Sequence, residues 1–400
     1  MENNTAEKSS IGIKAAILAI SVVQMGTNAI SPILSDLAES FPQAGSSSIQ
    51  LLMTFPSMFV IVFSLITANL ARTVPKKQIA ALGCGLFSAS GVLSWLVHPN
   101  LYVLFAWAGL MGIGIGLVVP MATSLVTDCF SGAEQKLVMG WQSSAANIGA
   151  MLMTFAGGLL AAVHWSCNYL VYLVALPGLV LALLCLPRSA GAVQEQDAVS
   201  EKRMGYFALL RRGSIAGACL LSLAVTMLFN TAPTNLSMYI AEKHLGSAAQ
   251  AGTATSVLLF SGTIGGLCFG WLARRLGRYV MVFGFCMLAI GQTMCALAPS
   301  MLVVFLGCMV CGCAISTVMP QVMLDAAEAS GGNPAASAAL VMSASNMGGF
   351  CAPAITVIAK AVTGQSTVAP RFFLSAGFGL MLAVVLAVFL LRTSRKRSGS

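Results

Sequence analysis

The stretch HPNLYVLFAWAGLMGIGIGLVVPMATSLVTD, residues 98–128, has a counterpart in APSMLVVFLGCMVCGCAISTVMPQVMLDAAE, residues 298–328. Both are long apolar runs, and the prolines in their second halves, Pro120 and Pro320, lie 200 residues apart. An earlier proline, a phenylalanine, a glycine and a final acidic residue match at the same spacing. Self-similarity at a fixed spacing indicates an internal repeat, so the sequence predicts two copies of one unit.

Two further pairs of segments support the repeat. The residues AANIG around Asn147 resemble ASNMG around Asn346, at an offset of 199 residues. The residues LARTVPK around Arg72 resemble LARRLGR around Arg274, at an offset of 202 residues. Near-constant offsets in three separate regions are the pattern that a duplicated unit leaves in a chain.

The composition identifies an integral membrane protein. Hydrophobic residues make up 58% of the 400 residues, charged residues only 8%, and the mean hydropathy is +0.88. An apolar run of about 20 residues is long enough for a helix to cross the hydrocarbon core. The runs are continuous and do not alternate, which favours helices over a membrane β-barrel. We place twelve transmembrane helices, at residues 12–35, 47–71, 78–97, 101–127, 137–162, 166–187, 214–240, 250–273, 279–297, 301–326, 335–361 and 370–391.

The fold class expected is therefore an all-α membrane protein with two pseudo-symmetric six-helix bundles. One long polar interval, residues 187–213, separates the two sets of six spans. We expect an N-terminal bundle over residues 1–187, a cytoplasmic linker over 188–213, and a C-terminal bundle with a cytoplasmic tail over 214–400. The first span is interpreted as an uncleaved helix, not a signal peptide.

The basic residues predict the orientation. With both termini and the linker inside, only Lys243, Lys360 and Arg371 of the 21 lysines and arginines lie outside or near outer helix ends. Such a bias is the positive-inside rule, and it also explains the net charge of +9 without nucleic acid as a partner. The expected location is the cell membrane, as a multi-pass protein with cytoplasmic termini, in a bacterial inner membrane. We expect a monomer whose partners are the lipid bilayer and a small-molecule solute.

The sequence predicts no enzyme, cofactor or metal site. Nearly all of the 12 cysteines lie inside apolar runs, where a thiol behaves as a small hydrophobic group. No nucleophile motif, metal-ligand spacing or Gly-rich phosphate loop occurs in the chain.

The loops after the second and eighth spans resemble the signature loop of the major facilitator superfamily, which reads Gly-x-Leu-Ala-Asp-Arg-x-Gly-Arg-Arg. With the twelve spans and the repeat, this resemblance covers essentially the whole chain, and it implies a secondary transporter with one solute site near the membrane midplane. An arginine replaces the expected aspartate in both loops, so the usual acidic latch of the cytoplasmic gate is not implied here. Antiporters of this family often carry Gly-Pro followed by a glycine pair in span five. That motif is also incomplete here, since Met153 and Thr154 replace Gly-Pro. The loop-motif residues are Arg72, Lys76, Lys77, Gly270, Arg274, Arg275, Gly277 and Arg278.

Polar side chains at mid-depth are the candidate solute-binding residues, because a polar group facing lipid is costly. The resemblance implies that spans one, five, seven and eleven line the cavity. Their polar residues are Gln24, Asn28, Asn147, Asn230, Thr234, Ser343 and Asn346. The alternative for these side chains is a bridge between neighbouring helices. For Asn147 and Asn346 the neighbouring glycines point to close helix packing.

Charged side chains are nearly absent at mid-depth, which favours a neutral or amphipathic organic solute. Asp36, at an outer helix end, is the candidate for coupling transport to a proton. The expected function is secondary active or facilitative transport by alternating access, with drug or metabolite efflux as one form. The alternative is a non-transporting membrane sensor or partner protein that uses the same fold.

Overall fold

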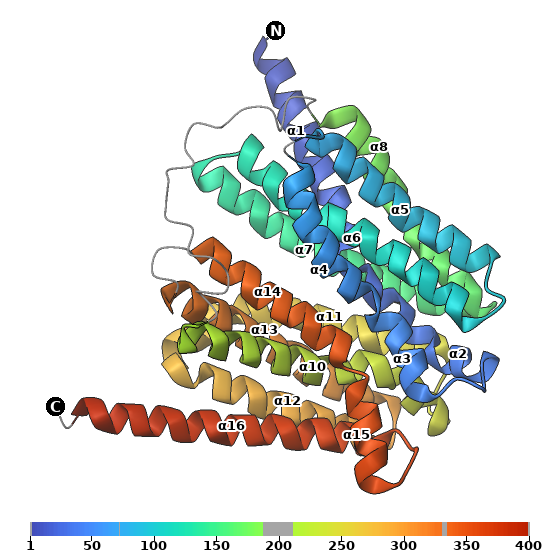
Figure 1. Ribbon diagram of the computed structural model, residues 1–400, viewed down its shortest axis with the longest axis vertical. Coiled ribbons are helices and arrows are strands. Elements are labelled where there is room, and N and C mark those ends of the chain that lie inside the picture. The colour runs from blue at the N-terminus through green and yellow to red at the C-terminus, as the bar shows by residue number, and fades with distance from the viewer. Residues whose placement is uncertain (1, 72, 187–210, 330–333, 399–400) are drawn as a thin grey trace. The chain divides into compact units, whose positions relative to one another are not determined.

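The computed structural model describes residues 2–71, 73–186, 211–329 and 334–398 (Figure 1). Within these ranges every regular element is a helix. The chain forms two compact units, one from residues 1–44 and 52–202 and the other from residues 45–51 and 203–400. Most of the expected linker, residues 188–210, lies outside the described residues, so the predicted domain boundaries remain predictions.

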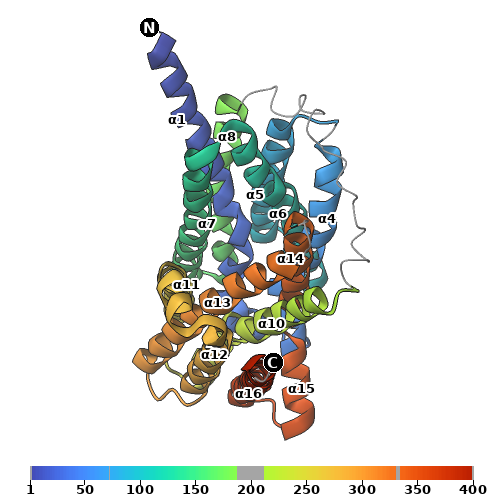
Figure 2. The same ribbon diagram turned by 90° about the vertical axis from the view of Figure 1, so that its left-hand side faces the viewer.

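The described residues of the first unit form ten helical segments, of which α3 is shared, because its residues 46–51 belong to the second unit. They are α1 (Glu2–Ser21), η1 (Val22–Ile33), α2 (Leu34–Ser40), α3 (Ser46–Thr54), α4 (Pro56–Leu70), α5 (Lys76–Leu96), α6 (Leu101–Cys129), α7 (Gly132–Ala161), η2 (Trp165–Val174) and α8 (Ala175–Cys185). Helix α6 packs against α4 and α5, α7 packs against η1, and α8 packs against α1 and α5 (Figure 2).

The second unit contains eight described helical segments after residue 211. They are α10 (Gly213–Glu242), α11 (Ala248–Leu276), η3 (Gly277–Tyr279), α12 (Val280–Ala296), α13 (Met301–Ala329), α14 (Pro334–Cys351), α15 (Ala354–Thr363) and α16 (Ala369–Ser398). Helix α13 packs against α11 and α12, α14 packs against α10, and α16 packs against α12. This pairing repeats that of the first unit, with α13 in the place of α6 and α14 in the place of α7.

Glycines make the same close approaches in the two units. A Cβ added to Gly112 of α6 would lie 2.4 Å from the Pro56 carbonyl oxygen of α4. A Cβ added to its repeat counterpart, Gly312 of α13, would lie 2.0 Å from the Leu258 carbonyl oxygen of α11. Only glycine lets the two backbones approach this closely. The repeat predicted from the sequence is therefore present in the helix packing, and the fold class is confirmed.

Fewer than twelve helices qualify as membrane spans when only helix length and hydropathy are considered. Ten helices among the described residues are long and apolar enough to cross a membrane, and a bent pair brings the total to up to eleven. That pair is Ser337–Cys351 with Ala354–Thr363, bent by 47°, and it matches the expected eleventh span. The expected ninth span is the shorter apolar helix Val280–Ala296.

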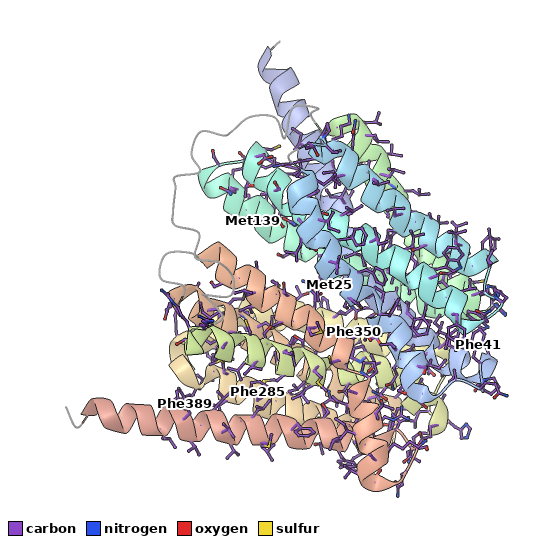
Figure 3. All side chains as sticks on the ribbon, viewed as in Figure 1. Met25, Phe41, Met139, Phe285, Phe350 and Phe389 are labelled. Atoms are coloured by element: carbon purple, nitrogen blue, oxygen red, sulfur yellow. The ribbon has the colours of Figure 1, made fainter. Side chains whose placement is uncertain are left out.

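Apolar side chains cover the outer faces of the helices as well as the core (Figure 3). Phe285 of α12 is fully buried, whereas Phe389 of α16 is 61% exposed. Large exposed apolar side chains of this kind occur on nearly every helix of both units. In water such a surface would be unfavourable, and in a bilayer it is the surface that faces lipid.

Candidate solute-binding residues and the membrane-transport fold

The predicted polar residues of the first unit lie on η1 and α7, which pack together. The Asn28 side chain donates its Nδ2 to the Met25 carbonyl at 3.2 Å, and Asn147 donates to the Ser143 carbonyl at 3.0 Å. Both side chains are partly exposed. Gln24 is also partly exposed, but its Nε2 is buried and has no hydrogen-bond partner among the described residues. Three uncharged amides therefore share one pair of helices.

The contact between η1 and α7 depends on a glycine two residues after Asn147. A Cβ added to Gly149 would lie 2.5 Å from Cγ1 of Val22. The amide of Asn147 thus sits one half-turn from the closest approach of the two helices. The close packing expected beside this residue is what the structure shows.

The predicted polar residues of the second unit lie on α10 and α14, the counterparts of η1 and α7. Asn230 donates to the Thr226 carbonyl at 2.8 Å, and Asn346 donates to the Met342 carbonyl at 3.1 Å. Ser343 donates to the Ala339 carbonyl at 2.9 Å. All three side chains are partly exposed.

Two further contacts join α10 to α14. The hydroxyls of Thr226 and Ser345 are hydrogen-bonded at 2.9 Å. A Cβ added to Gly348 would lie 2.2 Å from the carbonyl oxygen of Leu223. As in the first unit, the glycine follows the amide, here Asn346, by two residues.

Thr234 differs from the other predicted residues because it is fully buried. Its hydroxyl donates to the Asn230 carbonyl at 2.6 Å. It therefore bonds back to a carbonyl of its own helix directly after Pro233, a residue that has no N–H to donate within the helix.

A buried polar network in the second unit was not predicted. Asn235 Oδ1 accepts from Gln50 Nε2 at 2.5 Å and from Arg371 Nη1 at 2.9 Å. Gln50 Oε1 in turn accepts from the Thr356 hydroxyl at 2.5 Å. Arg371 completes its contacts through Nη2 to the Ser366 carbonyl at 2.9 Å, and the side chain is 4% exposed.

One sequence signal could have pointed to this network. Arg371 is the one basic residue in the first turns of the apolar run that begins at residue 369, and a charge there is costly unless it is paired. Two of its three acceptors lie on α10, namely Asn235 Oδ1 and, at 3.7 Å, Met238 Sδ. The third is the Ser366 carbonyl in the loop before α16. None of them is a carboxylate, because the nearby carboxylate of Glu242 accepts from the backbone N–H of Val368 instead, so a search for ion pairs does not find the network.

The candidate coupling residue, Asp36, is partly exposed near the end of the first membrane-crossing segment. Its Oδ1 accepts from the hydroxyl of the neighbouring Ser35 at 3.2 Å. No described basic side chain forms an ion pair with it.

The first loop motif contributes to an ion pair inside its own unit. Lys76 Nζ lies 2.5 Å from Asp128 Oδ2 and also donates to the Ser124 hydroxyl at 2.5 Å. A second ion pair joins Lys14 and Glu134 at 2.7 Å. These pairs hold α5 to α6 and α1 to α7. Arg72 lies outside the described residues, and Lys77 is partly exposed.

The second loop motif is exposed. Arg274 and Arg275 are both exposed, and the guanidinium of Arg275 lies 4.9 Å from the centre of the Trp271 ring. Gly270 is exposed, with nothing near its Cβ position. Gly277 ends α11 with a φ of 51°, a conformation that favours glycine. The backbone of Arg278 continues in η3, and its side chain is outside the described set.

Metal ligands do not gather in the described part of the chain, where no group of three His, Cys, Asp or Glu residues could hold an ion. The polar groups at mid-depth are neutral amides and hydroxyls, which can donate and accept hydrogen bonds to a small molecule.

The comparisons with known proteins agree with this architecture. The family model of the Major Facilitator Superfamily matches residues 16–353 and, in a second match, 219–400. In structure, the chain resembles a bacterial homolog of the human lysosomal transporter Spinster, with a TM-score of 0.76 and 14% identity. That likeness covers 97% of this chain and 98% of the other.

Two relatives in sequence are multidrug or drug-resistance proteins. The multidrug transporter protein MdtP of Bacillus subtilis is 24% identical over 146 residues, which are 36% of this chain and 26% of MdtP. The quinolone resistance protein NorA of Staphylococcus aureus is 27% identical over 144 residues, 36% of this chain and 37% of NorA. The matched region thus spans only 26% of MdtP and 37% of NorA. The match of the family model over most of the chain is more extensive. The chain therefore belongs to the Major Facilitator Superfamily, which places it among membrane transport proteins rather than enzymes.

Proposed function

We propose that the protein moves a small neutral or amphipathic organic solute across the bacterial inner membrane by alternating access. The observation that carries this proposal is the lack of charge in the stretches of helix around the candidate residues. Residues 15–35, 137–161, 213–241 and 334–351 contain no Asp, Glu, Lys, Arg or His. A strong anion or cation normally requires an opposite charge in its site.

The amides on these helices suit a neutral solute. Asn28, Asn147, Asn230 and Asn346 each donate Nδ2 to a carbonyl three or four residues earlier in their own helix. This bond fixes the amide and leaves its Oδ1 as an acceptor and its second N–H as a donor. A hydroxyl, amide or amine group of an uncharged solute can bond to both.

Efflux of drug-like compounds is the form of transport that the relatives support. MdtP is named a multidrug transporter and NorA a quinolone resistance protein. The chain contains 22 methionines and 20 phenylalanines, side chains that adapt to apolar solutes of different shapes.

The test is solute flux in proteoliposomes that contain the purified full-length protein. Asn28→Ala and Asn230→Ala are each expected to lower the uptake of an amphipathic neutral substrate, by roughly tenfold per lost hydrogen bond. Gln365→Ala, which removes an exposed loop amide, is the matched control and is expected to leave flux unchanged. Normal flux in both site variants would overturn the proposed site.

A charge introduced at the same position tests the proposed solute class. Asn230→Asp is expected to shift the preference from neutral solutes toward cationic ones of similar size. Ligand binding without flux for every solute tested would instead support the alternative, a sensor that uses the transporter fold.

Proton coupling through Asp36 is a separate part of the proposal. An imposed pH gradient is expected to accelerate flux in the unmodified protein and to have no effect in Asp36→Asn. An equal response to the gradient in both proteins would exclude Asp36 as the coupling group.

A further inference from the structure

A small cavity lies among η1, α3, α5, α6 and η2 of the first unit, and most of the residues that line it are apolar. It leaves about 10 Å³ for the centre of a water molecule. Its polar lining consists of four hydroxyl-bearing residues, Ser90 and Ser94 of α5 and Tyr169 and Tyr172 of η2. No charged side chain lines it.

The two tyrosine hydroxyls are the unusual groups in this lining. Tyr169 is 3% exposed and Tyr172 is 1% exposed. Neither hydroxyl oxygen has a hydrogen-bond partner among the described residues. Buried phenolic groups usually find a partner, because leaving one without hydrogen bonds costs free energy.

Two other polar groups of the lining already donate their hydrogen to backbone carbonyls. The Ser90 hydroxyl donates to the Phe87 carbonyl at 2.7 Å. The indole N–H of Trp107, which also lines the cavity, donates to the Val97 carbonyl at 2.9 Å. Neither of these two groups is a hydrogen-bond partner of the tyrosine hydroxyls.

Packing keeps the two tyrosines close to α5. A Cβ added to Gly91 would lie 2.6 Å from the Tyr169 carbonyl oxygen and 2.7 Å from Cβ of Tyr172. The rings of Tyr172 and Phe87 lie 4.8 Å apart between centres. These contacts fix the backbone of η2 at Tyr169 and the ring of Tyr172 against α5.

The second unit places a side chain at the matching position. Helix α12 corresponds to α5 at an offset of 201 residues, as Gly83 and Gly284 show by their like contacts with Val118 and Val318. At this offset Gly91 corresponds to Gln292, which is fully buried and donates to the Leu228 carbonyl at 3.0 Å. The second unit thus has an amide where the first has a glycine beside the cavity.

We propose that this cavity binds one structural water molecule, which bridges the hydroxyls of Tyr169 and Tyr172. A volume of about 10 Å³ for the water centre is close to the lower limit for holding one water. Two phenolic hydroxyls and two serine hydroxyls supply the two to four partners that a buried water needs. The water joins η2, in span six, to α5, in span three, and it satisfies both phenols at once.

The volume and the lining exclude other occupants. An organic solute or a lipid tail does not fit into space for a single water. A metal cation would require several charged or carbonyl oxygens, and no charged side chain lines the cavity.

The direct test is a structure of the purified full-length protein at a resolution that shows internal waters. The expected result is one density peak about 2.6–3.0 Å from both phenolic oxygens. An unfilled cavity in a map that shows other buried waters would overturn the proposal. So would hydrogen bonds from both hydroxyls to protein groups.

Paired substitutions test whether one water serves both tyrosines. Tyr169→Phe and Tyr172→Phe are each expected to lower the apparent melting temperature, on the order of 2–4 °C. Because either change removes a partner of the same water, the double variant is expected to match the worse single variant. Fully additive shifts would mean that the hydroxyls act independently, which contradicts a shared water.

Filling the cavity provides a second readout. Ala108 lines the cavity and is 6% exposed. Ala108→Val is expected to remove the density peak and to abolish the effect of Tyr172→Phe on melting temperature. Ala106→Val, at an exposed position of the same helix, is the matched control and should preserve both. If Tyr172→Phe lowers stability equally in both backgrounds, the shared-water proposal fails.

Discussion

Asn235 accepts two hydrogen bonds on a single oxygen, from the guanidinium of Arg371 at 2.9 Å and from the amide of Gln50 at 2.5 Å. The arginine is buried, and the side-chain oxygen to which it donates is neutral, while the carboxylate of Glu242 interacts with its charge without a direct hydrogen bond. Thr356 extends the network by donating to the Gln50 side chain. One asparagine therefore holds together residues from α3, α10, α15 and α16 within the second unit.

Removing the Asn235 oxygen is expected to destabilise the protein. In Asn235→Leu, the guanidinium of Arg371 and the amide of Gln50 both lose their acceptor. Hydrogen bonds to charged groups contribute about 1.5–3 kcal/mol, so we expect a loss of that size in the free energy of unfolding. Thermal unfolding of the purified protein in one detergent measures it.

The control keeps the acceptor at the same position. Asn235→Asp retains both acceptor contacts and adds a charge opposite to Arg371, so it should be much less harmful than Asn235→Leu. The double variant Asn235→Leu with Arg371→Met removes the unpaired charge and should recover part of the stability. Equal losses in the leucine and aspartate variants would contradict a role for the oxygen.

The glycines at the helix contacts give a graded prediction. At Gly348 an added methyl group meets the main-chain oxygen of Leu223 at 2.2 Å, and at Gly149 it meets a valine methyl group at 2.5 Å. A side chain can move aside more easily than a backbone. Gly348→Ala should therefore cost more stability than Gly149→Ala, and overpacking of this kind typically costs about 1–3 kcal/mol.

Glycines with free space at the Cβ position, on α7 and on α10, are the controls for this series. Gly140 of α7 and Gly217 of α10 have nothing within 4 Å of the Cβ position. Alanine there should be neutral or stabilise the helix by up to about 1 kcal/mol, because glycine has low helix propensity. A uniform effect of alanine at all four sites would show that close approach does not matter. Circular dichroism on heating distinguishes these outcomes.

The fold was largely predictable from the sequence because each membrane helix corresponds to a long apolar run of residues. The repeat was readable because the close-approach glycines and the prolines of α6 and α13 recur at offsets near 200 residues. The count of twelve was less secure, since α12 has only 17 residues and the run over residues 335–361 breaks at Pro353 into two helices bent by 47°. Length alone does not show such a bend.

The candidate site was predictable in part. Spacing along one helix placed Asn230 and its neighbours, and the glycine after Asn147 or Asn346 indicated the helix contact that the structure contains. The network of Asn235 was missed because its partners are 136 and 185 residues away in sequence and none is a carboxylate. The tyrosine cavity was missed because an unpaired hydroxyl is visible only when its surroundings are known.

The ion pair of Lys76 and Asp128 is expected to contribute little. Its side chains are 14% and 32% exposed, and ion pairs near the protein surface contribute at most about 1 kcal/mol. Lys76→Met should lower stability slightly in low salt, and the loss should shrink as salt screens the pair. Lys77→Met, the change at the adjacent lysine, is the control. A loss that does not depend on salt would assign the effect to the Ser124 hydrogen bond or to packing instead.

His164 caps the N-terminus of η2, and this contact can be tested by itself. Its Nδ1 accepts from the backbone N–H of Ser166 at 3.2 Å, so the neutral ring carries its proton on Nε2. His164→Ala removes the acceptor and leaves this N–H without it, and losing such a cap typically costs about 1 kcal/mol. His164→Asn supplies another good capping acceptor and should retain most of the stability.

His244→Asn is the control, because His244 is exposed and lies at the end of α10 with a φ of 52°, a conformation that asparagine tolerates. Differential scanning fluorimetry of the three variants should place only His164→Ala below the unmodified protein, and a similar loss in His164→Asn would assign the effect to the ring contact with Trp165 rather than to the cap.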